Sequence, residues 1–396
     1  MPWNERKSVD LRKEFVVEAA KGMEPLAELC RRFDISRVTG YKWLERFEQE
    51  GEPGLADRSR RPQQCPHAIP EARAERILDL RREHPRWGPR KLLAYLEARQ
   101  GEHVWPAASS VGELLKRHGL SHARPKRARI APYQQPLAHA DAPNRVWCAD
   151  FKGWFRCGDG TRCDPLTITD AFSRYLLRAR HVKKTDGPHV KSVFEAVFRA
   201  YGLPEAIRTD NGPPFASKAP AGLSRLSMWW LQLGIRHERI VPGCPQQNGR
   251  HERMHLTLKQ EVASPPCATI ELQQRSLVRF EKSFNHERPH EAIGNRMPAE
   301  LYTASTRAYP SRLANLAMPD EVTHRRRISQ SGEIWWKGNN VFISEVLEYQ
   351  SVGLCETAED FFDVYYGSVL LGHFDAQSHR FTAVKPPKPP RRMKGK

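Results

Sequence analysis

The chain has 396 residues, of which 64 are Lys or Arg and 46 are Asp or Glu, so that its formal net charge is +18. This length suggests roughly two to four domains, and the charge predicts a polyanionic partner. Hydrophobic residues make up 39% of the chain, which excludes disorder throughout. The sequence has no apolar run long enough for a membrane helix and no signal-peptide core at its start, so we expect a cytoplasmic protein without a membrane partner.

The eight cysteines include no C-x-x-C pair, so we expect reduced thiols and neither a zinc ribbon nor a thioredoxin-like site. Cys148, Cys157 and Cys163 form the one cluster in the sequence. Their spacing fits a two-stranded hairpin with its turn at residues 158–160 better than a tetrahedral metal site, which is the alternative.

Residues 1–52 are predicted to form a helix-turn-helix DNA-binding domain. Three helices are expected between residues 9 and 50, with the turn at residues 32–35. Ser36 can cap the third helix, and Val38 and Leu44 can face inward. The side chains that can face outward into a DNA major groove are Arg37, Thr39 and Lys42. A small helical bundle without groove contact is the alternative.

A linker over residues 53–70 leads to a second predicted helix-turn-helix domain over residues 71–120. Residues 121–140 contain no acidic residue and form a basic linker. We expect its Arg124, Lys126 and Arg127 to be drawn to phosphates, and a solvated spacer is the alternative.

Residues 141–305 have the pattern of an α/β domain. Three antiparallel strands are expected first, because the segments up to residue 182 are rich in β-branched and aromatic residues. A core-facing helix over residues 187–201, a short strand that ends near Asp210, a helix, a strand and two further helices follow. This order of elements is that of the ribonuclease H fold.

The helical period ends before residues 318–384, where short strands with glycine turns suggest a small β-barrel of the SH3-like kind. Arg325, Arg326 and Arg327 could contact phosphates there, and the pair Trp335–Trp336 could contact bases. Buried tryptophans and solvated arginines are the alternative. Residues 385–396 are basic and rich in proline, which predicts a disordered tail that seeks nucleic acid.

Three carboxylates stand at the ends of predicted elements. Asp150 lies in the first strand of the α/β domain, Asp210 lies 60 residues later, and Glu252 lies a further 42 residues on, in the first turn of a helix. Neighbouring strands would bring the aspartates together. Such an oxygen cage suits Mg²⁺, and two ions about 3.5–4 Å apart suit phosphodiester hydrolysis or transesterification. Asp164 and Asp170 compete for these roles, but we interpret them as turn and strand-end residues.

The residues around these carboxylates resemble a known family. The segments WCADFKGWF, TITDAFSRY, IRTDNGPPF, PGCPQQNGRHERMHLTLKQE and FNHERPHEAIGNRMPAELY, within residues 144–302, look like blocks of the DDE transposases of bacterial insertion sequences, whose core is similar to retroviral integrases. The resemblance implies that Asp150, Asp210 and Glu252 are the D, D and E that bind two Mg²⁺ ions, for which Mn²⁺ can substitute. It also places Gln247 and Asn248 within reach of DNA.

Lys259 resembles a family position that contacts the end of the element, with a solvated lysine as the alternative. The spacer between Asp210 and Glu252 is longer than is usual in the family, and the excess lies near SKAPAGLSR.

The resemblance implies a bacterial-type DNA transposase. It would bind the terminal inverted repeats of an insertion sequence, expose 3′-hydroxyls by Mg²⁺-dependent cleavage and transfer them to target DNA. Two ends must be joined while each chain has one triad, so at least a dimer on DNA is expected. The alternatives are a non-catalytic DNA-binding regulator derived from such an enzyme and a structure-selective nuclease of the same fold.

Overall fold

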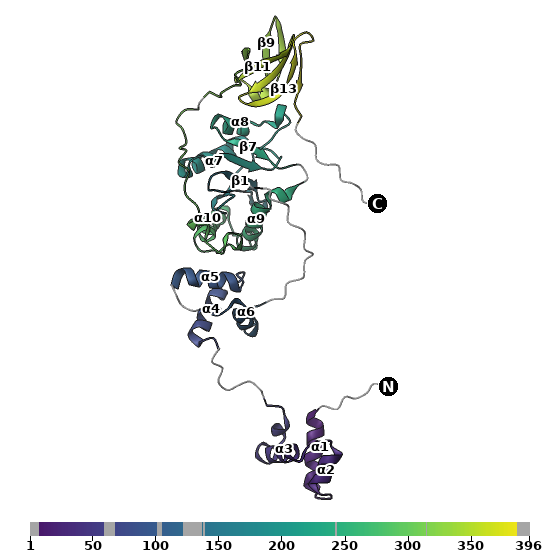
Figure 1. Ribbon diagram of the computed structural model, residues 1–396. Helices are drawn as coiled ribbons and strands as arrows, with labels where there is room; N and C mark the ends of the chain where they lie inside the picture. The colour runs from purple at the N-terminus through teal and green to yellow at the C-terminus, as the bar shows by residue number, and fades with distance from the viewer. Residues whose placement is uncertain are drawn as a thin grey trace, which may run out of the picture. The chain divides into compact units, whose positions relative to one another are not determined.

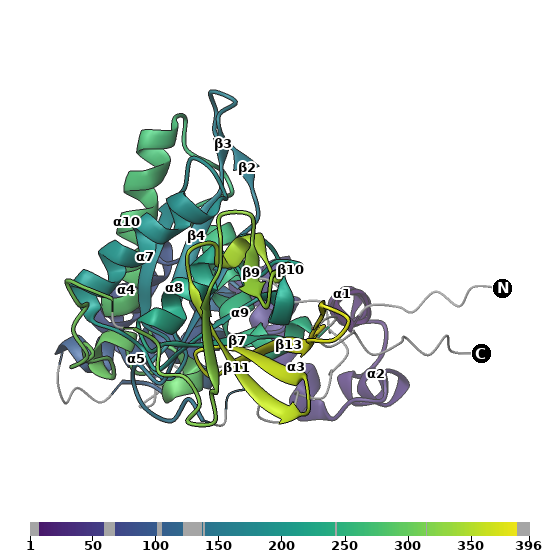
Figure 2. The same cartoon turned by 90° about the horizontal axis from the view of Figure 1, so that it is seen from above.

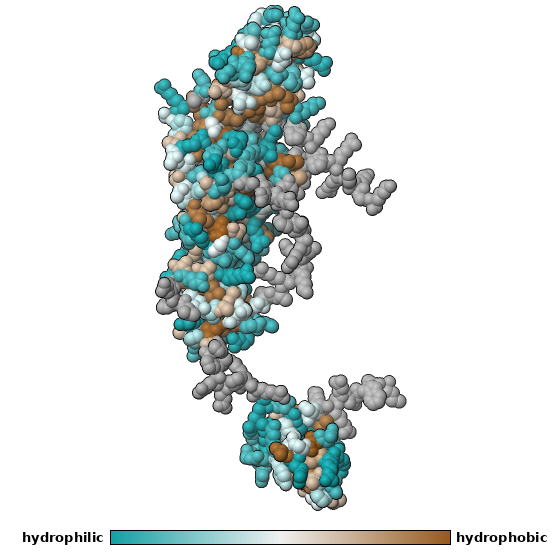
Figure 3. Space-filling view, in the orientation of Figure 1, coloured by the Kyte–Doolittle hydropathy of each residue, from teal (hydrophilic) through white to brown (hydrophobic). Residues whose placement is uncertain are grey.

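The computed structural model describes residues 8–58, 68–100, 105–121, 137, 139–241, 244–313 and 315–385 (Figure 1). The chain divides into two compact units, Met1–Pro70 and Glu71–Lys396, which are considered separately. Arg124, Lys126, Arg127 and the predicted tail beyond Lys385 lie outside the described residues. Within the described parts of the chain, no helix is long and apolar enough to cross a membrane. Polar residues cover much of the face in Figure 3.

The first unit contains the three predicted helices. They are α1 (Ser8–Lys21), α2 (Leu26–Arg32) and α3 (Arg37–Glu50), followed by the short helix η1 (Glu52–Leu55). The Ser36 hydroxyl accepts a hydrogen bond from the Thr39 amide at 3.1 Å, so the predicted cap is confirmed. The core of this unit consists of Phe15, Val16, Leu29, Cys30, Trp43 and Leu55.

One prediction for helix α3 is wrong. Val38 was expected to face inward, but it is 80% exposed. The buried stripe begins instead at Gly40, where an added Cβ would lie 2.6 Å from the Cys30 sulfur, and continues through Trp43 and Phe47. Val38 precedes Gly40 by two residues and is therefore about 200° away around the helix.

The second unit begins with three helices and continues with a mixed sheet. The helices are α4 (Glu71–Glu83), α5 (Pro89–Gln100) and α6 (Ala108–Arg117). The sheet has the order β5-β4-β1-β6-β7. Its strands are β1 (Val146–Phe151), β4 (Pro165–Asp170), β5 (Leu176–His181), β6 (Ala206–Thr209) and β7 (Arg236–Arg239).

Strands β1, β4 and β5 are antiparallel, whereas β6 and β7 run parallel to β1. This is the predicted ribonuclease H topology. Its longer helices are α7 (Gly187–Tyr201), α8 (Arg225–Gln232), α9 (Gly249–Glu261) and α10 (Ile270–His286). The shorter helices are η2 (Pro220–Gly222), η3 (Pro245–Asn248), η4 (Glu291–Ile293) and η5 (Pro298–Glu300).

Helices cover both faces of this sheet. Trp147 and Ala149 of β1 share one buried cluster with residues of α7 and α8, among them Phe194 and Trp230. Leu176 and Ala179 of β5 share another cluster with residues of α9 and α10, which include Met254, Leu277 and Phe284.

Helix α10 covers the edge strand β5. The Asn285 side chain accepts a hydrogen bond from the Leu176 amide and donates one to its carbonyl, at 2.8 and 2.9 Å. Glu281 accepts from the Ala179 amide, and Gln274 accepts from the His181 amide. These side chains lie on one helix face and satisfy main-chain donors that an edge strand otherwise leaves open.

Strands β2 (Phe155–Arg156) and β3 (Arg162–Cys163) form the predicted hairpin, which projects beyond the sheet (Figure 2). Cys157 donates its amide to the Thr161 carbonyl across the turn. The described cysteines are free thiols, and in the described ranges no cluster of three or more His, Cys, Asp or Glu side chains could hold a metal ion.

The last part of the chain is an antiparallel β domain. Its sheet has the order β14-β13-β12-β11-β8, and the separate hairpin β9–β10 belongs to the same domain. The strands are β8 (His324–Arg327), β9 (Glu333–Trp336), β10 (Asn339–Phe342), β11 (Ser351–Ala358), β12 (Phe361–Tyr366), β13 (Val369–Asp375) and β14 (Arg380–Ala383), with the short helix η6 (Glu345–Leu347) before β11.

The predicted small barrel is thus an antiparallel sheet with a hairpin over it. Ile334, Trp336 and Val341 of the hairpin share a buried cluster with Leu354 and Phe374 of the sheet. The hydrogen-bonded ladder does not close among the described strands, because β9 and β10 pair only with each other. The tryptophan pair divides in the way that strand alternation requires, with Trp336 buried and Trp335 61% exposed.

The long spacer between Asp210 and Glu252 contributes to this domain's packing. Leu223 and Met228 belong to the buried cluster of the C-terminal strands. In addition, the Ala221 amide donates a hydrogen bond to the Val384 carbonyl at 3.1 Å. The extra residues therefore give the C-terminal sheet a contact with the α/β core.

Candidate active site

The pairing of β1 with β6 brings the two aspartates together. These parallel strands align Val146 with Ala206 and Cys148 with Arg208. The same offset of 60 residues, continued for two residues, places Asp150 opposite Asp210 at the carboxyl end of β6. The sequence separation of the two acids therefore equals the register of the strands.

Glu252 approaches from helix α9. It lies in the first turn of that helix and is exposed. Asp170, which competed for an acidic role, is instead buried and accepts hydrogen bonds from the Asn144 and Ser173 amides. Asp164 pairs with Arg162 beside the hairpin.

The carboxylates repel one another electrostatically. Burial, and then the charges of Asp210 and Glu252, raise the pKa of Asp150 to about 7. Burial also raises the pKa of Asp210, although the Gly212 amide donates a hydrogen bond to its Oδ1 at 3.2 Å. Buried carboxylates that repel each other suit a divalent cation, which prefers oxygen donors. Asp150 and Asp210 fit such an ion by chemistry, while Glu252 lies at the exposed rim.

A buried polar network fixes helix α9 against the sheet. The Thr167 hydroxyl on β4 contacts Nε2 of His251 at 2.8 Å and Nε2 of His255 at 2.7 Å. It also donates to the Asp150 carbonyl at 3.0 Å. The Thr169 hydroxyl contacts Nδ1 of His251 at 2.8 Å. One hydroxyl on β4 thus connects the strand that carries Asp150 with the helix that carries Glu252.

The hydrogen bonds of this network assign the imidazole protons. Because the Thr167 hydroxyl donates to a carbonyl, it accepts from both Nε2 atoms, so that each histidine is neutral and protonated on Nε2. Burial lowers the pKa of His251 well below its ordinary value and that of His255 to about 3, which agrees with neutral rings. The unprotonated Nδ1 of His255 then lies 3.9 Å from Oδ2 of Asp150.

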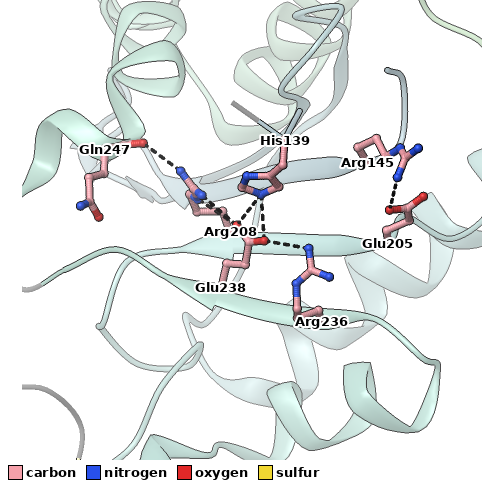
Figure 4. A network of polar contacts seen from close by, with 7 residues as sticks. All are labelled: His139, Arg145, Glu205, Arg208, Arg236, Glu238 and Gln247. Carbon is pink, nitrogen blue, oxygen red and sulfur yellow. Dashed lines mark hydrogen bonds and ion pairs between the residues drawn. The ribbon is translucent and has the colours of Figure 1, made fainter. Parts of the chain in front are cut away.

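A second network lies on the outer strands beside the site (Figure 4). Glu238 on β7 accepts hydrogen bonds from Arg208 on β6 at 2.8 Å and from Arg236 at 3.1 Å, and it contacts His139 at 3.0 Å. Arg208 also donates to the Gln247 carbonyl at 3.5 Å, just before helix α9. Burial opposes ionisation of Glu238, but the hydrogen bonds from both arginines hold its pKa below its ordinary value.

The residues expected to contact DNA are placed as follows. Arg37 and Lys42 are exposed on α3, whereas Thr39 is half-buried, with its hydroxyl 2.9 Å from that of Ser36. Lys259 is exposed on α9, close enough to Lys152 for its charge to contribute, with burial, to lowering the pKa of that lysine.

Gln247 and Asn248, at the start of helix α9, are less accessible. The Gln247 side chain accepts from the Val241 amide at 2.8 Å. Asn248 is 2% exposed, and its buried Oδ1 has no hydrogen-bond partner in the described part of the chain. Neither side chain is presented to solvent as the sequence suggested.

The arginines of β8 alternate in exposure along the strand. Arg325 and Arg327 are exposed, whereas Arg326 is half-buried with its guanidinium 5.1 Å from the centre of the Trp336 ring.

Sequence reasoning missed the two histidines and Thr167. The signal was present in the segment HERMH, where histidines four residues apart flank Glu252 and therefore share a helix face. Their partner on β4 is 84 residues away from His251, and no local pattern points to it.

Comparison with protein families gives matches along much of the chain. Integrase core domain models match residues 140–245 and 233–298. A helix-turn-helix domain model matches residues 11–63, and a homeodomain-like domain model matches residues 39–115. The 31.7 kDa protein of insertion element IS407 from Burkholderia multivorans is 30% identical over 233 residues, which are 58% of this chain and 80% of that protein.

The chain belongs to the insertion-element proteins with an integrase core. The 39.2 kDa protein of insertion element IS476 from Xanthomonas euvesicatoria is 29% identical over 270 residues, 67% of this chain and 73% of that protein. Membership implies that the helix-turn-helix domains of this integrase-family protein bind DNA and that its core is a polynucleotidyl transferase.

Solved integrases are more distant. The simian T-cell lymphotropic virus intasome in complex with PP2A regulatory subunit B56 gamma is 17% identical, with a TM-score of 0.37, over 74% of this chain and 97% of that chain. The HTLV-2 integrase catalytic core domain in complex with magnesium is also 17% identical, with a TM-score of 0.33, over 41% of this chain and 98% of that chain.

Removing the charge of Glu238 should destabilise the α/β core. Glu238→Gln leaves the largely buried Arg208 without its carboxylate, and we expect the free energy of unfolding at pH 7 to fall by about 1–3 kcal/mol. Glu205→Gln is the control, because Glu205 and its partner Arg145 are both about half exposed and such pairs contribute about 0–1 kcal/mol. Urea unfolding measures both, and equal losses would contradict the structural role of the Glu238 network.

Removing the hydroxyl of Thr167 should have a larger effect than its size suggests. Thr167→Val keeps the shape but leaves two imidazole N–H groups without an acceptor, so we expect a loss of about 1–3 kcal/mol in unfolding free energy. In the control Thr257→Val, the lost hydroxyl only bonds to the Arg253 carbonyl of its own helix, so the loss should be smaller. Thermal unfolding of both variants tests this, and the reverse order would refute the network.

Proposed function

We propose that this integrase-family protein is a DNA transposase that cleaves the 3′ ends of its own insertion element and joins them to target DNA. The observation that carries the proposal is the register that pairs Asp150 with Asp210, with Glu252 delivered by helix α9. In this proposal the three are the catalytic and metal-binding residues. The integrase core matches and the insertion-element relatives support the same chemistry.

The three carboxylates would hold two Mg²⁺ ions, or Mn²⁺ in their place. Bound ions of this kind supply activation of the attacking oxygen and stabilisation of the leaving oxygen in an in-line displacement. The chain's own contribution is position: the β1–β6 register aligns the aspartates, and the Thr167 network holds helix α9 so that Glu252 faces them. First a water oxygen attacks the phosphorus and the bond to the 3′ oxygen breaks, and then the released 3′-hydroxyl attacks a target phosphorus.

The remaining domains would bind DNA. We assign the two helix-turn-helix domains to residues 1–52 and 71–120, separated by the linker 53–70, the basic linker to 121–140, the core to 141–305, the β domain to 318–384 and the tail to 385–396. In the proposal, domains 1–52 and 71–120 recognise the terminal inverted repeats, and the exposed side chains of Arg37 and Lys42 read one of them. The other proposed DNA contacts are Thr39, Arg124, Lys126, Arg127, Gln247, Asn248, Lys259, Arg325, Arg326 and Arg327. Because each chain has one triad, joining two ends requires at least a dimer.

Glu252→Gln should abolish joining without abolishing DNA binding. Because the change removes a charged metal ligand but no contact of the helix-turn-helix domains, we expect cleavage and joining to fall at least about 10³-fold, the effect of several kcal/mol at the transition state. The assay uses purified protein, Mg²⁺ and labelled duplexes from the DNA on either side of its gene. The matched control is Glu271→Gln, which removes an exposed carboxylate from the first turn of the next helix.

Cleavage by Glu252→Gln at the wild-type rate would overturn the triad. Cutting without joining by the wild type would favour the structure-selective nuclease. Binding to confirmed inverted repeats without cutting or joining would favour the regulator.

Alanine at both Arg37 and Lys42 should weaken binding to the inverted repeats. Each lost phosphate contact lowers the slope of log affinity against log salt by about 1, while a lost base contact costs about 1–3 kcal/mol on the specific sequence. Lys21→Ala is the control, because it removes an exposed charge of the same domain from the end of α1. Fluorescence anisotropy over a salt series measures the slope, and equal effects of both changes would show that α3 does not read DNA.

A further inference from the structure

An exposed tryptophan follows the strand of the first catalytic aspartate. Trp154 lies between β1 and the β2–β3 hairpin and is 57% exposed. Gly153 before it has φ +83°, a conformation that turns the chain out of the strand and that side chains rarely adopt. Tryptophan burial stabilises a fold strongly, so an exposed ring at a strand end needs an explanation beyond the packing of this domain.

Two arginines of the hairpin surround this ring. The guanidinium carbons of Arg162 and Arg156 lie 5.1 and 5.9 Å from the ring centre. Arg162 is held by both oxygens of Asp164, at 2.7 and 2.8 Å, and Arg156 donates to the Gly160 carbonyl at 2.7 Å. The hairpin thus fixes cations around the ring while more than half of the ring's surface stays open to solvent.

The ring is also close to the catalytic carboxylates. Trp154 is four residues after Asp150, which spans at most about 14 Å of extended chain. On the same side of the site, Lys152 lies near both Asp150 and the exposed Lys259 of helix α9. A DNA strand whose phosphate reached the carboxylates would therefore meet this ring within a few nucleotides.

The chemistry of the surroundings selects the partner. A second copy of this chain, which carries a formal charge of +18, would bring more positive charge to a surface already lined by lysine and arginine. A DNA strand supplies negative phosphates for the cations and a flat base for the indole. Every base has an aromatic face, so such stacking needs an unpaired base but no particular sequence.

We propose that Trp154 is a stacking platform for an unpaired base of the DNA strand that passes through the active site, with Arg156 and Lys152 contacting its phosphates. The inference rests on the proposed function, because it names a contact of the same DNA substrate. Trp154 is a positioning residue for that strand and takes no part in the bond changes.

Photo-crosslinking of the full chain tests the contact directly. The probe is a 12-nucleotide oligo(dT) that carries one 5-iododeoxyuridine, with a duplex of the same length as the second probe. We expect a covalent adduct on the peptide that contains Trp154 with the single strand and little with the duplex. An adduct confined to other peptides would overturn the proposal, and so would equal labelling of this peptide by both probes.

Affinity measurements on variants add the energetic side. Trp154→Ala should weaken oligo(dT) binding at this site about 5- to 150-fold, the range for one stacked base, and should lower the crosslink yield accordingly. Trp154→Phe keeps an aromatic face and should keep most of the yield. Trp335→Ala removes the similarly exposed tryptophan of β9 and should leave the Trp154 adduct unchanged. An unchanged yield with an altered sedimentation coefficient in Trp154→Ala would instead assign the ring to a protein interface.

The joining assay separates this inference from the proposed function. If the wild type joins DNA ends through Glu252 but no adduct forms on Trp154, the function stands and the platform fails. If the adduct forms but the wild type joins nothing, the platform stands as a DNA contact and the transposase proposal fails.

Discussion

The parallel pairing of β1 with β6 is the constraint on which the rest of the site depends. Its offset of 60 residues puts Asp150 beside Asp210, although two buried carboxylates repel each other and burial already disfavours their charge. This arrangement is unfavourable for the fold alone. The hydrophobic cluster beneath it, which includes Trp147 and Phe194, supplies the stability that keeps the strands in register.

The third carboxylate depends on a different interaction. Helix α9 meets β4 through neutral imidazoles and threonine hydroxyls, and not through apolar contacts alone. Hydrogen bonds are directional, so this contact sets the rotation of the helix more narrowly than a greasy face would. The cost is that each member of the network needs its partner, because a buried donor without an acceptor destabilises the fold.

Positive charge is arranged around this acidic centre at several distances. Lys152 and Lys259 lie beside the carboxylates, the arginines of the hairpin surround Trp154, and Arg325 and Arg327 are exposed on the C-terminal sheet. DNA binding at such surfaces depends on salt, whereas the metal-binding chemistry depends on the carboxylates. The two contributions can therefore be separated by experiment.

Local sequence patterns determined the elements and the identity of the acids. The apolar period of helix α7, the Ser36 cap, the strand order and the family blocks around Asp150, Asp210 and Glu252 were all visible in the chain. Only the tertiary structure decided which way Val38 faces, that Asn248 is buried, that β9 and β10 leave the ladder open, and that Thr167 joins His251 and His255. Periodicity and capping act over a few residues, whereas these outcomes depend on partners tens of residues away, which a local pattern does not specify.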